Sequence, residues 1–301
     1  MWVGSNASPL LFLFFFTIPH VYAHQEKPHV VLIDTDSHCS PQYATHHHTS
    51  RALILSQAPE AIIHHIPFIT QEKKTVQSYK QLVRDIQKIP EPIVLFAGSF
   101  DEPMSHELRA HLADVFRELC AHAWMVIAPA GNNNIWQRKP QLAYPAAYEG
   151  VVSVGSFGCA GKNVYIAPFS QYTPQRGPLF LLPGIRITPG PGQQPTSGTS
   201  VSAALMTGFI ARVHMLFGSL FTKQHLMHVL RICSVKMDTD NEWRTHGVHG
   251  ILDMRYALRL LQLLYAYEQR AREQSLHWRL HTHFERLVQI AESTLLESVC
   301  F

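Results

Sequence analysis

Segments typical of buried β-strands alternate with segments typical of helices along the first half of the chain. Five apolar runs lie at residues 29–33, 61–66, 92–96, 123–128 and 151–155. Helical patterns fall between them at residues 76–88, with an apolar face of Tyr79, Leu82, Val83 and Ile86, and at residues 105–121, with Ser105 as the expected cap. This alternation predicts an α/β fold with a doubly wound, mostly parallel sheet and helices on both faces. In such a sheet, ligands bind where strands end.

Composition narrows the class of protein. The chain has 301 residues, 46% of them apolar, which is enough for one large domain with a substantial core. Its net charge of +3 is small and its Lys and Arg residues are not clustered, so we expect no nucleic-acid partner. The 20 histidines predict pH-dependent behaviour. The five cysteines show no zinc-ligand spacing, so buried thiols are the default and we expect neither a metal nor a cofactor.

Residues 1–23 are typical of a secretory signal peptide. The apolar run Leu10–Ile18 is too short to span a bilayer, and Val21-Tyr22-Ala23 fits a small-x-small cleavage site. The mature chain would begin near His24 and be exported to the periplasm or medium, with no transmembrane segment left. Because no Lys or Arg precedes the apolar run, a buried strand or an uncleaved anchor is the alternative.

Asp34 and a run of three histidines lie where their side chains could carry chemistry. Asp34 ends the first strand, where a carboxylate either serves a site or caps the next turn. His46, His47 and His48 precede a helix predicted from Ser50, after a loop at residues 39–45. Successive helical residues point about 100° apart, so the three imidazoles cannot form one metal-ligand face, and we expect one functional histidine and two solvated ones.

Ser200 stands where a loop becomes a helix. Residues 189–196 are rich in Gly, Pro and Gln, and residues 201–216 lack proline and favour helix. A hydroxyl there lies beside unpaired backbone N–H groups that can stabilise a developing negative charge. The alternative is an ordinary helix cap. Behind it, Ala204, Gly208 and Ala211 form a small-residue face, which we expect to pack closely on the sheet.

The chain offers the parts of serine catalysis: a carboxylate at Asp34, a base at His47, an amide donor at Asn132 and a nucleophile at Ser200. Their order is that of the subtilisin arrangement. At this point the chain resembles the subtilisin-like serine peptidases over residues 29–261. The segments that carry this resemblance are Val31-Leu32-Ile33-Asp34-Thr35, His47-His48-Thr49-Ser50-Arg51-Ala52, Ala58-Pro59-Glu60-Ala61, Ala130-Gly131-Asn132, Tyr144-Pro145-Ala146-Ala147, Val151-Val152-Ser153-Val154-Gly155, Phe169-Ser170, Gly198-Thr199-Ser200 and Gly250-Ile251-Leu252-Asp253.

The resemblance implies a serine endopeptidase acting on polypeptide substrates. Ser200 would be the nucleophile, His47 its base, Asp34 the orienting carboxylate and Asn132 the oxyanion-hole amide. The segments implied to bind substrate are Ala97-Gly98-Ser99 and Pro129-Ala130-Gly131.

Several residues depart from the family's pattern. His48 occupies the position where the family has a glycine after the base, and Arg51 replaces an apolar residue of the base helix. Ala204 occupies the position where a proline usually follows the nucleophile. No calcium loop is recognisable, and too few residues separate Ala23 from the first strand for the family's propeptide. The alternative function is therefore a catalytically weak or inactive peptide-binding protein. An esterase is disfavoured because no Gly-x-Ser-x-Gly occurs.

We predict a peptidase domain at residues 24–267 and a helical extension at 268–301. Leu280, Phe284, Leu287, Ala291 and Leu295 form an apolar stripe in the extension. This stripe predicts a helix that docks on the domain itself, and the alternative is a contact with a partner protein.

Overall fold

The computed structural model describes residues 26–35, 41–69, 75–99, 105–133, 142–161, 163–172, 178–235, 250–273 and 280–299. The predicted signal peptide at residues 1–23 lies outside these ranges. The same holds for residues 100–104, which follow one predicted substrate segment.

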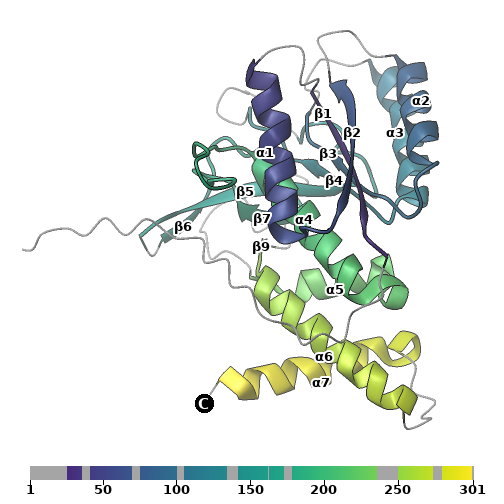
Figure 1. Cartoon of the computed structure of the whole chain (residues 1–301), viewed down its shortest axis with the longest axis vertical. Helices are drawn as coiled ribbons and strands as arrows, with labels where there is room; N and C mark the ends of the chain where they lie inside the picture. The colour runs from purple at the N-terminus through teal and green to yellow at the C-terminus, as the bar shows by residue number, and fades with distance from the viewer. Residues whose placement is uncertain are drawn as a thin grey trace, which may run out of the picture.

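The described residues form one mixed sheet in which most neighbouring strands are parallel (Figure 1). Its order is β2-β1-β3-β4-β5-β7-β9-β8, with β6 pairing β5 from outside this path, and the β5–β6 and β8–β9 pairs are antiparallel. The strands are β1 (His29–Thr35), β2 (Ile62–Ile69), β3 (Ile93–Phe96), β4 (Met125–Pro129), β5 (Val152–Ala160), β6 (Asn163–Ile166), β7 (Phe180–Pro183), β8 (Ser234–Val235) and β9 (Gly250–Leu252). All five strands expected in the first half of the chain are present, so the predicted α/β fold class is confirmed.

Helices cover both faces of the sheet (Figure 1). They are α1 (Pro41–Gln57), α2 (Val76–Ile86), α3 (His106–His122), α4 (Thr199–Phe217), α5 (Lys223–Ile232), α6 (Met254–Glu273) and α7 (Leu280–Val299), with a short 3₁₀ turn at Gly218–Leu220. The α2 and α3 helices pack on one face, where the four predicted apolar residues of α2 are buried. The α1 and α4 helices pack on the other, and Ser105 caps α3 as expected.

The α4 helix is the apolar centre of the molecule. It is long and apolar enough to cross a membrane, but 78% of its most apolar window is buried inside the protein, as in a core helix. Its small-residue face differs from the prediction at one position. A Cβ atom on Gly208 would lie 2.7 Å from the carbonyl oxygen of Ile54, so Gly208 allows close packing of α4 on α1 rather than on the sheet.

The α1 helix begins earlier than the sequence predicts. Residues 41–45 are helical, although we expected a loop there and a helix from Ser50. Proline is compatible with the first helical turn because the N–H group that it lacks would have no partner there. Pro41 therefore starts a helix that carries all three adjacent histidines.

The C-terminal stripe packs inside the chain. Phe284, Leu287 and Ala291 are buried together with Val288, in the same core as residues of α5 and α6. The ring of Phe284 stacks on His225 of α5 at a centroid distance of 4.1 Å. The side chains of Leu280 and Leu295 lie outside the described set. The expected docked helix therefore accounts for the described part of the stripe, and the proposed domain boundary at 267/268 falls within the continuous helix α6.

Three cysteines lie in the described residues, and all are free thiols. Cys233 is buried, as we expected of the thiols, and Cys120 is half-buried. Cys159 on β5 is exposed and differs from that expectation. Burial raises the pKa of the Cys120 thiol to about 11, so this group is a neutral core side chain.

Replacing Phe284 with alanine should destabilise the folded protein. The substitution removes a buried ring from the α5–α7 contact, and we expect the free energy of unfolding to fall by about 3 kcal/mol. Urea denaturation measures this change. Glu285→Ala, the exposed neighbour on α7, should change stability little. Equal effects of the two substitutions would contradict docking of the helix.

Candidate active site

Asp34 lies where the winding of the sheet changes direction. Its strand β1 pairs with β2 on one side and β3 on the other, so the chain crosses from one side of β1 to the other after β2. Ligands of doubly wound sheets bind at such a switch point, outside the carboxyl ends of the strands. Asp34 is the second-last residue of β1 and is fully buried.

Hydrogen bonds hold the Asp34 carboxylate in its charged form. The backbone N–H of Thr35 donates to Oδ1 at 2.7 Å, and the imidazole of His46 contacts Oδ1 at 2.8 Å and Oδ2 at 3.0 Å. Burial raises the pKa of Asp34, but the hydrogen bond and charge of His46, with smaller contributions from Thr35 and Ser50, lower it further. The net pKa is below the ordinary value, so Asp34 is an anion at neutral pH.

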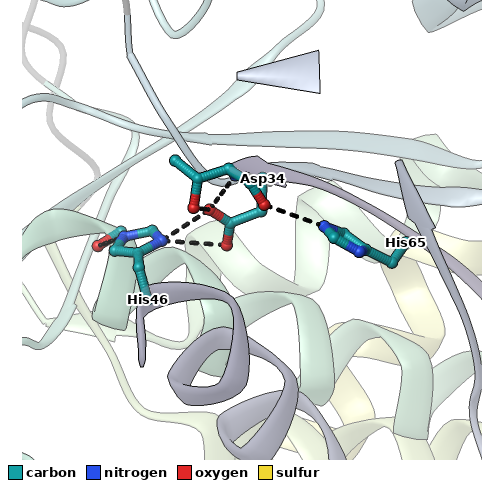
Figure 2. Close-up of polar contacts among 5 residues, drawn as sticks. Asp34, His46 and His65 are labelled. Atoms are coloured by element: carbon teal, nitrogen blue, oxygen red, sulfur yellow. Dashed lines mark hydrogen bonds and ion pairs between the residues drawn. The ribbon is translucent and has the colours of Figure 1, made fainter. Parts of the chain in front are cut away.

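His46 bridges Asp34 and Ser200. Figure 2 shows its contact with the Asp34 carboxylate. Its Nδ1 atom faces the carboxylate, and its Nε2 atom lies 3.1 Å from Ser200 Oγ. Because a carboxylate only accepts, Nδ1 carries the proton, and neutral Nε2 is left to accept the Ser200 hydroxyl proton. Burial lowers the pKa of His46, while the hydrogen bond and charge of Asp34 raise it by more, so the net pKa lies above 6.5.

This position of His46 corrects the sequence-based assignment of the base to His47. His46 and Ser50 are four residues apart on α1, so they share the face that meets Asp34. His47 is turned by about 100° and is buried against β2, where its ring stacks on His65 at 3.8 Å. His65 Nε2 in turn lies 3.3 Å from the carbonyl oxygen of Thr35 (Figure 2). Of the three histidines, only His48 is exposed.

Asn132 lies beside the start of α4 with its side chain oriented by Thr199. The Asn132 Oδ1 atom accepts from the Thr199 backbone N–H and from Thr199 Oγ1, both at 2.9 Å. Thr199 Oγ1 also accepts from the Gly131 N–H at 3.2 Å. Since Oδ1 faces Thr199, the amide NH₂ group of Asn132 remains available on the side of Ser200.

The Ser200 hydroxyl and the Asn132 amide both face a small space next to Gly198. A Cβ atom on Gly198 would lie 3.4 Å from Ser200 Oγ and 3.5 Å from Asn132 Nδ2. A side chain at this position would therefore occupy the space that the hydroxyl and the amide face. Glycine at this position leaves room for a reacting group between the Ser200 hydroxyl and the Asn132 amide.

The two predicted substrate segments lie at the carboxyl ends of neighbouring strands. Ala97-Gly98-Ser99 follows β3, with Ser99 exposed, and Pro129-Ala130-Gly131 ends β4 and leads to Asn132. The strands β3 and β4 are paired in parallel, so both segments emerge at the same edge as Asp34. Within the described part of the chain, no group of three His, Cys, Asp or Glu side chains is arranged to hold a metal ion.

A family model described as the subtilase family matches residues 33–249. This match spans well over half of the chain and includes Asp34, His46, Asn132 and Ser200. The chain belongs to the subtilase family. Members of this family are peptidases, so this subtilase is a hydrolase that takes peptides as substrates. A search of curated protein sequences finds no significant match.

Solved structures share the subtilase fold at low sequence identity. The Prenylagaramide maturation protease PagA is 20% identical, with 79% of this chain and 94% of that one covered and a TM-score of 0.59. The A-subunit of the AB5 toxin from E. coli is 16% identical, with 79% and 94% covered and a TM-score of 0.61. Fervidolysin from Fervidobacterium pennivorans is 17% identical, with 77% and 42% covered and a TM-score of 0.58. At these identities the likeness shows the fold alone.

Sequence reasoning missed two residues of the site besides His46. Ser50 supports Asp34, and its i+4 spacing from His46 would have indicated a shared face if the helix had been predicted from residue 41. Thr199 orients Asn132, but these residues are far apart in sequence and only the fold brings them together.

We predict that His46 titrates above its ordinary pKa of 6.5, whereas in Asp34→Asn its pKa falls below the wild-type value. The carboxylate is the cause of the increase, and the burial that lowers the pKa remains after the substitution. NMR titration of the imidazole signals measures both values. Asp85→Asn, an exposed carboxylate on α2, serves as the control and should leave the His46 titration unchanged. A wild-type pKa at or below 6.5 would contradict the assigned contact.

Proposed function

We propose that this subtilase is a serine endopeptidase that uses Asp34, His46 and Ser200 as its catalytic triad. The observation that carries the proposal is the continuous series of contacts from the buried Asp34 carboxylate through His46 to Ser200 Oγ, at 2.8 and 3.1 Å. Hydroxyl, base and orienting carboxylate in this geometry are what nucleophilic serine catalysis requires.

In the proposed mechanism, Ser200 Oγ attacks the scissile carbonyl carbon while His46 Nε2 takes its proton. Asp34 accepts the Nδ1–H hydrogen bond and stabilises the imidazolium that forms. The amide of Asn132 and the backbone N–H of Ser200 donate to the oxyanion of the tetrahedral intermediate. The equivalent asparagine of subtilisin contributes roughly 2.7–4 kcal/mol to this step. His46 then protonates the leaving amine, and a water molecule hydrolyses the acyl-enzyme by the reverse sequence.

The pH dependence follows from the protonation of His46. The base is active only when neutral, so activity rises with pH through the pKa of His46. Because Asp34 holds that pKa above 6.5, the rising limb should lie on the alkaline side of the ordinary histidine value.

We predict that Ser200→Ala and His46→Ala each lower kcat on the order of 10⁶-fold, and that the double variant loses little more, as the corresponding substitutions in subtilisin do. Asp34→Ala should lower kcat on the order of 10⁴-fold, as removal of the aspartate does in subtilisin. Hydrolysis of a fluorogenic peptide measures kcat, and reaction with a fluorophosphonate followed by mass spectrometry identifies the labelled serine.

His47→Ala is the matched control because it removes the neighbouring imidazole from the same helix. It should retain wild-type kcat within about tenfold, since His47 packs on His65 and does not meet Ser200. Loss of activity in His47→Ala with activity kept in His46→Ala would overturn the assignment. A folded protein that binds peptides but neither cleaves them nor labels at Ser200 would establish the alternative of an inactive peptide-binding subtilase.

We further propose that the chain is exported through the signal sequence at residues 1–23. Support comes from the apolar run Leu10–Ile18 and the Val21-Tyr22-Ala23 cleavage pattern. Leu13→Arg interrupts the run and should retain the protein in the cytoplasm, whereas Gln25→Arg, beyond the expected cleavage site, should not. Cell fractionation and N-terminal sequencing from a bacterial host check both variants. Export with an intact N-terminus would show that the segment is not a cleaved signal.

A further inference from the structure

Two buried serine hydroxyls lie directly behind the first turn of α4. Ser156 on β5 and Ser202 on α4 are both fully buried, and their Oγ atoms are 2.8 Å apart. Ser156 Oγ donates to the carbonyl oxygen of Gly198 at 3.1 Å. Ser202 Oγ lies 3.1 Å from the Leu182 carbonyl oxygen and 2.9 Å from that of Pro183. The pair thus connects β5, the end of β7 and the start of α4.

The space around the pair is closely filled. A Cβ atom on Gly184 would lie 2.2 Å from Ser156 Oγ and 2.5 Å from Ser202 Oγ, so only glycine fits beside the two hydroxyls. Ser202 lies two residues after Ser200, and its hydroxyl contacts the sheet at the end of β7.

The hydrogen-bond pattern assigns different roles to the two serines. Each hydroxyl has one proton, so the contacts cannot all be donated at once. Ser202 can donate to Ser156 or to the β7 carbonyls. When Ser202 donates to Ser156, the Ser156 proton is directed to the Gly198 carbonyl, which only Ser156 of the two contacts. Loss of Ser156 therefore removes the link to Gly198, whereas loss of Ser202 removes the contact that orients Ser156 and the contacts with the β7 carbonyls.

Gly198 sets the position of the nucleophile. Its N–H donates to the Gly184 carbonyl at 2.9 Å, and its carbonyl accepts from the Val201 N–H at 3.2 Å in the first turn of α4. Ser200, within that turn, must keep its hydroxyl 3.1 Å from His46 Nε2. A small displacement of a reacting group can lower a rate severely, so a bond that holds this turn from behind affects catalysis.

We propose that Ser156 is a positioning residue for the Ser200 nucleophile and that Ser202 acts through it. The role rests on the proposed function of Ser200. Ser156 fixes the Gly198 carbonyl, and this in turn orients the Ser200 hydroxyl toward His46 and its N–H toward the oxyanion.

Ser156→Ala should lower kcat about tenfold with KM nearly unchanged, since one hydrogen bond that aligns the nucleophile is lost. The rate of fluorophosphonate labelling at Ser200 should fall in proportion. Ser153→Ala is the matched control. Ser153 is also fully buried on β5, and its Oγ accepts from the Leu179 N–H, away from Ser200. Its removal should lower stability while leaving kcat unchanged.

The order of action is tested by combining substitutions. If Ser202 acts through Ser156, Ser202→Ala should lower kcat less than Ser156→Ala, and the double variant should match Ser156→Ala alone. Additive losses would show that Ser202 acts by a separate route. Equal kcat in Ser156→Ala and wild type, with stability lowered as in Ser153→Ala, would overturn the proposal and leave Ser156 a structural residue only.

Hydrogen exchange tests the inference without relying on turnover. The backbone N–H groups of Val201 and Ser202 approach the Gly198 carbonyl at 3.2 and 3.5 Å. Ser156→Ala should make these amides exchange faster, and Ser153→Ala should not. Faster exchange in Ser156→Ala, together with no labelling of the wild-type protein at Ser200, would refute the proposed function while showing that Ser156 holds this turn. Equal exchange of these amides in Ser156→Ala and wild type would show that Ser156 does not stabilise this turn.

Discussion

A buried negative charge at the end of β1 is the constraint around which the site is arranged. The carboxylate of Asp34 is shielded from water, and an unpaired buried charge would be strongly destabilising. His46, Thr35 and Ser50 compensate it with hydrogen bonds. The partner of Asp34 that also reaches Ser200 is an imidazole, so the group that stabilises the charge is also the group that can accept a proton.

The two halves of the site are carried by two helices that pack closely together. His46 is on α1 and Ser200 is at the start of α4, 154 residues apart in sequence. The absence of a side chain at Gly208 lets α4 approach the backbone of α1 at Ile54, on the same face of the sheet. This close packing fixes the separation of the helices, while Ser156 and Ser202 attach the first turn of α4 to the sheet. The distance between His46 Nε2 and Ser200 Oγ therefore depends on packing outside the site.

Membership of the subtilase family and the shared fold agree with this organisation, although solved relatives share only 14–20% of their residues with this chain. A shared fold does not by itself assign a role to a polar residue, so each role is argued from the site. The neighbouring histidines of α1 illustrate this. His47 is buried against His65, and its pKa is lowered by burial and then by the charge of His65. It therefore packs on β2, although it is next to His46 in sequence.

The sequence alone determined the class of fold, because the alternation of apolar runs and amphipathic segments reports burial on a sheet directly. It also predicted Asp34, Asn132 and Ser200 as candidate site residues, since each occurs in a short local motif. It assigned the base to His47, whereas His46 makes the contacts with Asp34 and Ser200, because that choice depends on how α1 is rotated about its axis. The rotation is set by packing of α1 on β1 and α4, so only the tertiary structure turns His46 toward Asp34 and His47 toward His65. The contact of Ser156 with Gly198 is likewise tertiary, because 42 residues separate the two and only the pairing of β5 with β7 brings them together.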